Sequence, residues 1–249
     1  MKIDINDYYK PIMKREVSHH AAVAIIESEN KKEFLFDVYG DNYAILDYHS
    51  RINFIGGNHN DEDISPWDIW KREIEEEFSL DDIEEKGENL TIPGKSSRPK
   101  GEFAPLEDIL TIRNEIIKNA RPYKDFYFET PSLRMFKDEE IIKLPIGKCI
   151  YSVFLSSVNN DLFGEIKTYL REGKAIKQEG QTCIRNIEQL IKEEPLCAAG
   201  TGLIMNDYLG VNIPNPDNAK LEYLGKPRNF MQDYLLDFEY KRPVRTATG

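Results

Sequence analysis

Residues 65–80 have the sequence SPWDIWKREIEEEFSL and predict a helix with an apolar stripe beside an acidic edge. Ser65 is a favourable N-cap, and Pro66 suits the first helical position because its missing N–H would have no helical partner there. The large apolar side chains recur at spacings of three and four, as expected for one buried helix face; they are Trp67, Trp70, Ile74 and Phe78. We therefore expect a helix from residue 66 to about residue 78 that packs this stripe against a core.

The acidic edge of this helix brings three carboxylates together. Glu73, Glu76 and Glu77 fall within one arc of about 100° beside the apolar stripe. Like charges at these spacings cost roughly 0.2–0.5 kcal/mol per pair. A hard divalent cation, Mg²⁺ or Mn²⁺, would relieve this repulsion because it prefers carboxylate oxygens. Arg72 precedes Glu76 by four residues, where it can pair with that carboxylate and orient it. The alternative is a solvated acidic face without a ligand.

The flanking sequence predicts strands before and after this helix. The segment HAAVAIIE at 20–27 is rich in small and β-branched residues, which is typical of a buried strand. Further strands are predicted at 33–39, 51–55 and 149–158, with 175–179 as another candidate. The strand at 51–55 is expected to end at Gly56-Gly57. Helices are predicted at 106–120, 184–194 and 195–209, the last ending at Gly210.

Gly57 and the segment REIEEEFSL at residues 72–80 together resemble the Nudix box. The pattern of this box is G-x5-E-x7-R-E-U-x-E-E-x-G-U, where U is aliphatic. The core R-E-U-x-E-E is complete. One extra residue separates Gly57 from Arg72, so the first glutamate of the box corresponds to Glu62 or Asp63. Ser79 replaces the final glycine of the box. The resemblance, including the order of strands and helix, covers about half of the chain.

The resemblance implies an α/β fold, namely a Nudix-type α/β/α sandwich with a mixed β-sheet. We expect a single Nudix-like domain over residues 1–240, with its core at about 18–80 and 146–210. An insertion of about 81–145 would follow the box helix, and a C-terminal extension would end in a flexible tail at 241–249. The resemblance also implies that the domain can form a homodimer.

The resemblance also implies a reaction and its residues. Glu76 and Glu77 would be the principal metal ligands, Glu73 a further ligand or the base, and the carbonyl of Gly56 a possible oxygen donor. Family members often recruit one more glutamate from a later loop, and Glu179 is the candidate, although a surface glutamate in a turn is the alternative. The implied reaction is attack of an activated water on one phosphorus of a nucleoside diphosphate linked to another moiety. The implied cofactor is Mg²⁺ or Mn²⁺.

Other residues are candidates for substrate binding. His59 lies in the loop before the helix and could touch the substrate, although a loop histidine without this role is the simpler interpretation. Arg98 and Lys100 belong to the basic segment KSSRPK and could bind phosphate, or the segment is a solvated loop. The aromatic residues of 123–128 could stack on a base, but we expect them to form a satellite core.

Composition limits the classes of partner. The chain has 249 residues, 40% of them hydrophobic, and a net charge of −11. Such a charge argues against general binding to nucleic-acid backbones or anionic membranes. No window approaches the roughly 18 apolar residues of a membrane span, and the N-terminus lacks a signal-peptide core. Three cysteines without a CxxC spacing predict reduced thiols. We expect a cytoplasmic protein that binds a nucleotide-like substrate, or a Nudix-fold sensor that binds such a ligand without turnover.

Overall fold

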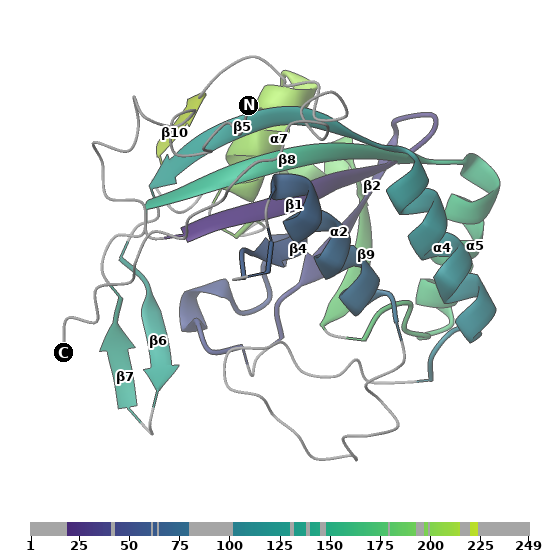
Figure 1. Cartoon of the computed structure of the whole chain (residues 1–249), viewed down its shortest axis with the longest axis horizontal. Coiled ribbons are helices and arrows are strands. Elements are labelled where there is room, and N and C mark those ends of the chain that lie inside the picture. Colours follow the sequence, from purple (N-terminus) through teal and green to yellow (C-terminus); the bar gives the residue numbers. More distant parts are fainter. Residues whose placement is uncertain are drawn as a thin grey trace.

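The computed structural model describes residues 19–40, 43–60, 62–63, 65–79, 102–129, 132–137, 140–144, 148–178, 180–192, 197–198, 200–214 and 220–223. These residues form an α/β structure in which an eight-stranded sheet lies between helices (Figure 1). The sheet is mixed, since one central pair of strands is parallel and the others are antiparallel. The predicted fold class, an α/β/α sandwich with a mixed sheet, is therefore confirmed.

One half of the sheet is built on the parallel pair. Strand β1 (His19–Ser28) runs parallel to β8 (Lys148–Val158) along its full length. Strand β5 (Ala120–Glu129) is antiparallel to β8, and β10 (Lys220–Tyr223) completes this edge. Alternate residues of β1 belong to the two cores, one on each face of the sheet. This double burial explains why its sequence is an almost continuous apolar run.

The other half of the sheet divides beside β1. The first part of β1 pairs with β4 (Ile55–Asn58), and its last part pairs with β2 (Glu33–Val38). Strand β2 also pairs with β3 (Ile52–Asn53) and with β9 (Gln181–Asn186). The end of β2 that carries Asp37 pairs with β3 and β9 instead of β1, whereas β4 stays paired with β1 as far as Asn58.

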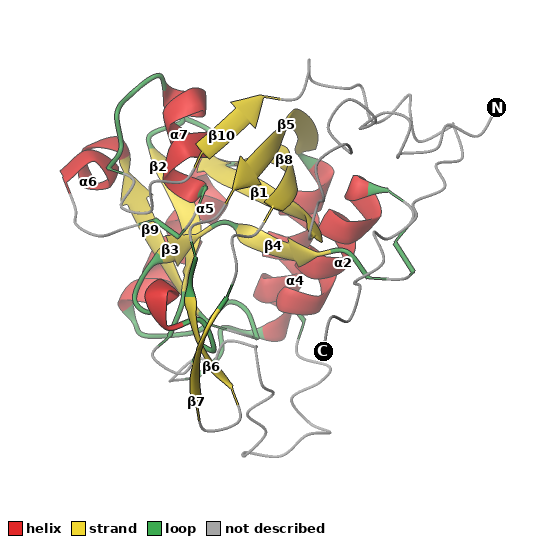
Figure 2. Cartoon of the chain, turned by 90° about the vertical axis from the view of Figure 1, so that its left-hand side faces the viewer, coloured by secondary structure: helices red, strands yellow, loops and turns green. Residues whose placement is uncertain are grey.

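Helices cover both faces of the sheet. Helices α2 (Pro66–Glu77), α4 (Leu106–Lys118) and α5 (Asn160–Arg171) contribute to one core, and their arrangement beside the sheet is visible in Figure 2. Helices α6 (Ile187–Lys192) and α7 (Thr201–Leu209) contribute to the core on the opposite face. No helix in the described part of the chain is long and apolar enough to cross a membrane.

Helix α2 forms as the sequence predicts. The Ser65 hydroxyl accepts a hydrogen bond from the Asp68 amide at 3.2 Å, so the predicted N-cap is confirmed. The side chain of Trp70 is fully buried and stacks on Phe154 of β8, with ring centroids 5.2 Å apart. Because the apolar stripe is anchored in this core, the neighbouring acidic edge is fixed at the rim of the sheet.

Two small peripheral elements complete the described structure. A short 3-10 helix, η1 (Leu46–Tyr48), follows β2. Strands β6 (Arg134–Lys137) and β7 (Glu140–Lys143) form a separate hairpin that extends beyond the main sheet (Figures 1 and 2). The three cysteines are free thiols, in agreement with the sequence prediction.

Several predicted elements differ from the structure. The helix expected at 195–209 begins only at Thr201, and Cys197 before it forms an isolated bridge to Ile52. The strand expected at 51–55 does not end at Gly56-Gly57, because β4 continues through both glycines while pairing with β1. The helix expected at 184–194 is a strand as far as residue 186, since β9 pairs with β2. Asn186 and Gln189 then form reciprocal side-chain-to-backbone hydrogen bonds of 2.9 Å that start α6. In the candidate strand at 175–179, only an isolated bridge from Ala175 to Phe103 is found among the described residues.

Part of the expected insertion at 81–145 belongs to the main fold. Helix α4 packs in the same core as α2, and β5 lies inside the sheet between β8 and β10. The sequence at 120–129 includes a proline and several charged residues, which obscured its strand character. A register shift between Pro122 and Lys124 accommodates that proline in the ladder.

Candidate functional site

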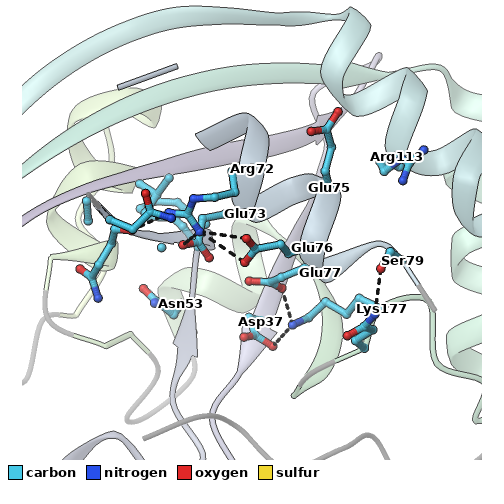
Figure 3. Close-up of a pocket in the computed structure, with 18 of the residues that line it drawn as sticks. Asp37, Asn53, Arg72, Glu73, Glu75, Glu76, Glu77, Ser79, Arg113 and Lys177 are labelled. Carbon is cyan, nitrogen blue, oxygen red and sulfur yellow. Dashed lines mark hydrogen bonds and ion pairs between the residues drawn. The ribbon is translucent and has the colours of Figure 1, made fainter. Parts of the chain in front are cut away.

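A cavity of about 790 Å³ lies along the acidic edge of α2. Its walls come from β1, β2 and β4, from α2 and α4, and from the loop that precedes β9 (Figure 3). All three glutamates of the predicted acidic edge line it: Glu73, Glu76 and Glu77. The structure therefore brings the predicted carboxylates to a single concave space.

Arg72 holds the first part of this site together. Its guanidinium donates two hydrogen bonds to Asp63, Nε to Oδ1 at 3.1 Å and Nη2 to Oδ2 at 3.0 Å. Its Nη1 lies 2.8 Å from Glu73 Oε1 and 3.3 Å from both oxygens of Glu76. The predicted pairing with Glu76 is thus confirmed. Asp63 is buried and Glu62 is exposed, so of these two carboxylates Asp63 is the one that binds Arg72.

Glu73 is held in a narrow space between Arg72 and strand β4. A Cβ atom at Gly57 would lie 2.2 Å from Glu73 Cδ, so the carboxylate occupies the volume that any larger residue at position 57 would fill. Burial raises the pKa of Glu73 to about 7, helped by the charges of Glu77 and Glu76 and opposed by Arg72. A cation placed beside Glu73 would lower this pKa again.

Lys177 holds the second part of the site. Its Nζ lies 2.7 Å from Glu77 Oε2 and 3.1 Å from Asp37 Oδ1, and its side chain is 1% exposed (Figure 3). Burial lowers the pKa of Lys177, but Asp37 and Glu77 outweigh this effect and raise the pKa above its ordinary value. Lys177 therefore remains a cation. Burial raises the pKa of Asp37 to about 7, despite the opposing charge of Lys177.

The charges of these two networks do not balance. Among the described residues, five carboxylates lie around the two cations Arg72 and Lys177; they are those of Asp37, Asp63, Glu73, Glu76 and Glu77. Full ionisation would leave three excess negative charges in a partly buried space. An added cation would be favoured by this excess.

The donor set fits a divalent ion in its chemistry. Arg72 engages Oε1 of Glu73 and Lys177 engages Oε2 of Glu77, which leaves one oxygen of each carboxylate for a cation. Within the described ranges, no group of three Asp, Glu, His or Cys side chains is already arranged as a metal-binding cluster. A bound ion would accordingly share these carboxylates with Arg72 and Lys177.

The other predicted site residues lie in different places. Gly56 is part of β4 and lines the cavity, as its proposed role requires. His59 is half-buried, and its ring Nε2 lies 3.1 Å from the carbonyl oxygen of Asp63; it does not line the cavity. Glu179, Arg98 and Lys100 lie outside the described residues.

Three charged residues of the cavity were missed in the sequence. Asp37 is a charged residue within the apolar strand EFLFDVY, and this break in the apolar pattern was an available signal. Lys177 carries no such signal. Arg113 of α4 also lines the cavity, and its buried Nε has no hydrogen-bond partner among the described residues. Only the tertiary structure places these three side chains near α2.

Comparison with known proteins adds no relative. No protein-family model matches the sequence, and no curated protein matches it. The Nudix resemblance accordingly rests on the motif residues themselves.

Proposed function

We propose that the chain is a divalent-metal-dependent hydrolase of the Nudix type, which cleaves a diphosphate linkage in a nucleoside diphosphate joined to another moiety. One observation carries this proposal: the three motif glutamates line one cavity in which carboxylates outnumber cations. An acidic cavity repels a diphosphate unless a metal ion accompanies it. The motif and the charge excess therefore favour the same cofactor, Mg²⁺ or Mn²⁺.

Each part of the site has a role in this reaction. Glu76 and Glu77 would hold the ion, which when bound would supply positive charge for the phosphate oxygens and acidify an attacking water. Glu73 lies beside them and would accept the proton of that water. Arg72 fixes the orientation of Glu73 and Glu76 through its contacts of 2.8 and 3.3 Å. The proposed reaction thus depends on residues 72–77 of α2 being held in a fixed orientation.

Two features of the cavity fit the two ends of a nucleotide-like substrate. Arg113 offers a guanidinium for an anionic group, since its Nε has no hydrogen-bond partner among the described residues. Tyr39 and Tyr43 also line the cavity, and their rings stack with centroids 4.1 Å apart. Aromatic faces of this kind favour planar groups such as a nucleobase.

The direct test is hydrolysis of a substrate panel by the full chain. Nucleotide sugars and dinucleoside polyphosphates are supplied with Mg²⁺ or Mn²⁺, and phosphate-containing products are separated and measured. We expect Glu76→Gln and Glu77→Gln each to reduce turnover by roughly 100-fold or more, since even loss of an outer-shell partner costs 10–100-fold. Glu165→Gln, at an exposed position on α5, is the matched control and should retain activity. Unchanged turnover in both motif variants would contradict the proposal.

The second candidate is a sensor that binds a nucleotide-like ligand without cleaving it. It is favoured by the contacts of Arg72 and Lys177, which already occupy oxygens of all three motif glutamates. Calorimetric titration with the same panel separates the two functions. Tight binding without turnover under either metal would support the sensor and exclude the hydrolase. We expect either protein to act in the cytoplasm. Sedimentation of the full chain tests the proposed homodimer, which would show the mass of two copies.

A further inference from the structure

Lys177 is a fully buried cation in the cavity that the three motif glutamates line. Its Nζ contacts Glu77 Oε2 at 2.7 Å and Asp37 Oδ1 at 3.1 Å. These two carboxylates come from α2 and from β2, so the ammonium joins elements that are distant in sequence. Contacts within a single helix cannot produce this arrangement.

The loop that carries Lys177 is fixed to both elements. The amide of Gln178 donates to the carbonyl of Glu77 at 2.7 Å, and its side-chain Nε2 donates to Ser79 Oγ at 2.8 Å. On the other side, a Cβ at Gly180 would lie 2.6 Å from Asp37 Oδ1, so only glycine permits this approach. These contacts place the loop, and with it the ammonium, between the end of α2 and β2.

The surroundings of the ammonium are those of a cation site. Two carboxylates in a space of low dielectric repel each other strongly unless a positive charge lies between them. Mg²⁺ and Mn²⁺ use the same oxygen donors but at shorter distances, about 2.0–2.1 Å for Mg²⁺. An ammonium and a divalent ion cannot occupy this position together.

We propose that the ammonium of Lys177 is a built-in cation of the cavity, which occupies the position between Asp37 and Glu77 and prevents a divalent ion from binding there. Lys177 holds Glu77 through Oε2, at 2.7 Å. It is a positioning residue that limits the number of metal ions. This inference goes beyond the hydrolase proposal, because it requires only cation binding and no turnover.

The test measures how many Mn²⁺ ions the full chain binds. The concentration of free Mn²⁺ is determined from its electron paramagnetic resonance signal. Removing the charge in Lys177→Met keeps an unbranched apolar side chain and should free the two carboxylates. We expect the variant to bind one more Mn²⁺ per chain than the unaltered protein. Lys177→Arg retains the charge and should show the unaltered number.

Lys174→Met is the matched control. This lysine belongs to the same loop, its side chain is 33% exposed, and it pairs with Glu172 at 2.9 Å. It should leave the number of bound Mn²⁺ ions unchanged. An equal gain in Lys174→Met and Lys177→Met would overturn the inference, because general loss of positive charge would explain it.

Poor folding of Lys177→Met does not prevent the test. The variant is then refolded from urea with and without Mn²⁺, and its circular dichroism is recorded. Recovery of the native signal only with Mn²⁺, with the extra ion bound, supports the inference. Failure to fold with Mn²⁺, or folding without an extra ion, overturns it.

The outcomes also separate this inference from the proposed hydrolase. If the unaltered protein binds no Mn²⁺ while Lys177→Met binds one ion, the built-in cation is supported and the metal-dependent hydrolase is contradicted. If the unaltered protein binds Mn²⁺ and Lys177→Met shows no gain, only the built-in cation is overturned. Absence of binding in both proteins contradicts both proposals.

Discussion

The Arg72 network and the Lys177 network hold opposite parts of the same cavity in different surroundings. The side chain of Arg72 is 21% exposed, and its partners range from the buried Asp63, 3% exposed, to the outermost carboxylate Glu76, 56% exposed. Lys177 is 1% exposed, and its partners Asp37 and Glu77 are 11% and 16% exposed. Arg72 binds residues close to it in sequence, whereas Lys177 joins β2, α2 and the loop before β9.

This difference decides how much each charge contributes to stability. Water screens the contact between Arg72 and Glu76, and exposed ion pairs contribute about 0–1 kcal/mol. A buried network contributes little in net terms when intact, but removal of one partner leaves an uncompensated charge without water. The two networks should therefore respond differently to the loss of a single charge.

The largest effect is expected when the centre of the buried network is removed. Without metal, Lys177→Met should lower the free energy of unfolding by roughly 3–5 kcal/mol, the usual cost of breaking a buried ion pair. Urea denaturation, monitored by tryptophan fluorescence, measures this change, because Trp70 is buried in the adjacent core. Lys174→Met, which removes a more exposed charge from the same loop, should change it by no more than about 0.5 kcal/mol. A loss below 1 kcal/mol in Lys177→Met would mean that water screens this network as well.

A pH series gives the next largest effect and examines Glu73 in the Arg72 network. The pKa of this carboxyl rises from 4.5 to about 7 on folding. Between these values Glu73 of the folded protein therefore retains a proton that the unfolded chain has lost, so the contribution of Glu73 to stability is fully present below pH 4.5 and is lost as pH rises to about 7. The decline due to Glu73 should be roughly 3 kcal/mol and should level off above pH 7.

The comparison that isolates Glu73 is a Glu73→Gln variant measured over the same pH range in EDTA. Its stability should decline less than that of the unaltered protein, with the difference confined to pH 4.5–7. Saturating Mg²⁺ should also reduce the decline in the unaltered protein, because a nearby divalent ion lowers carboxyl pKa values. Identical pH profiles for the two proteins would show that Glu73 is ionised without cost, as an exposed carboxylate is.

The same contrast explains what the sequence revealed. The N-cap of α2, its apolar stripe and the Arg72–Glu76 pair depend on residues within a few positions of one another, and all three were predicted. Helix geometry alone determines such contacts. The acidic edge was therefore located correctly before any tertiary contact was known.

The rest depends on strand pairing and long-range packing. Residues 184–186 follow a helical pattern, yet they form part of β9 because they pair with β2. The sequence predicted a divalent ion and Arg72 beside the acidic edge, but it did not predict the second positive charge that Lys177 supplies. No local pattern connects Lys177 with Asp37, because their contact exists only after β2, α2 and the later loop converge.

The smallest stability change is expected for Glu76→Gln, and it separates metal binding from folding. Glu76 is mostly exposed, and its contact with Arg72 is 3.3 Å long, so neutralising it should change the free energy of unfolding by no more than about 0.5 kcal/mol. Glu77→Gln, in contrast, deprives the buried Lys177 of one of the two carboxylates that it contacts among the described residues. This loss should cost roughly 1–3 kcal/mol.

Both variants should nevertheless weaken Mn²⁺ binding, because each removes a charged oxygen donor from the same edge of α2. Urea denaturation and Mn²⁺ titration of the two proteins therefore give different rankings if the networks differ as described. Equal stability losses would mean that exposure does not distinguish the networks. Loss of Mn²⁺ affinity in Glu77→Gln alone would place the ion on the Lys177 side of the cavity, where a divalent ion and the ammonium would have to compete for the same carboxylates.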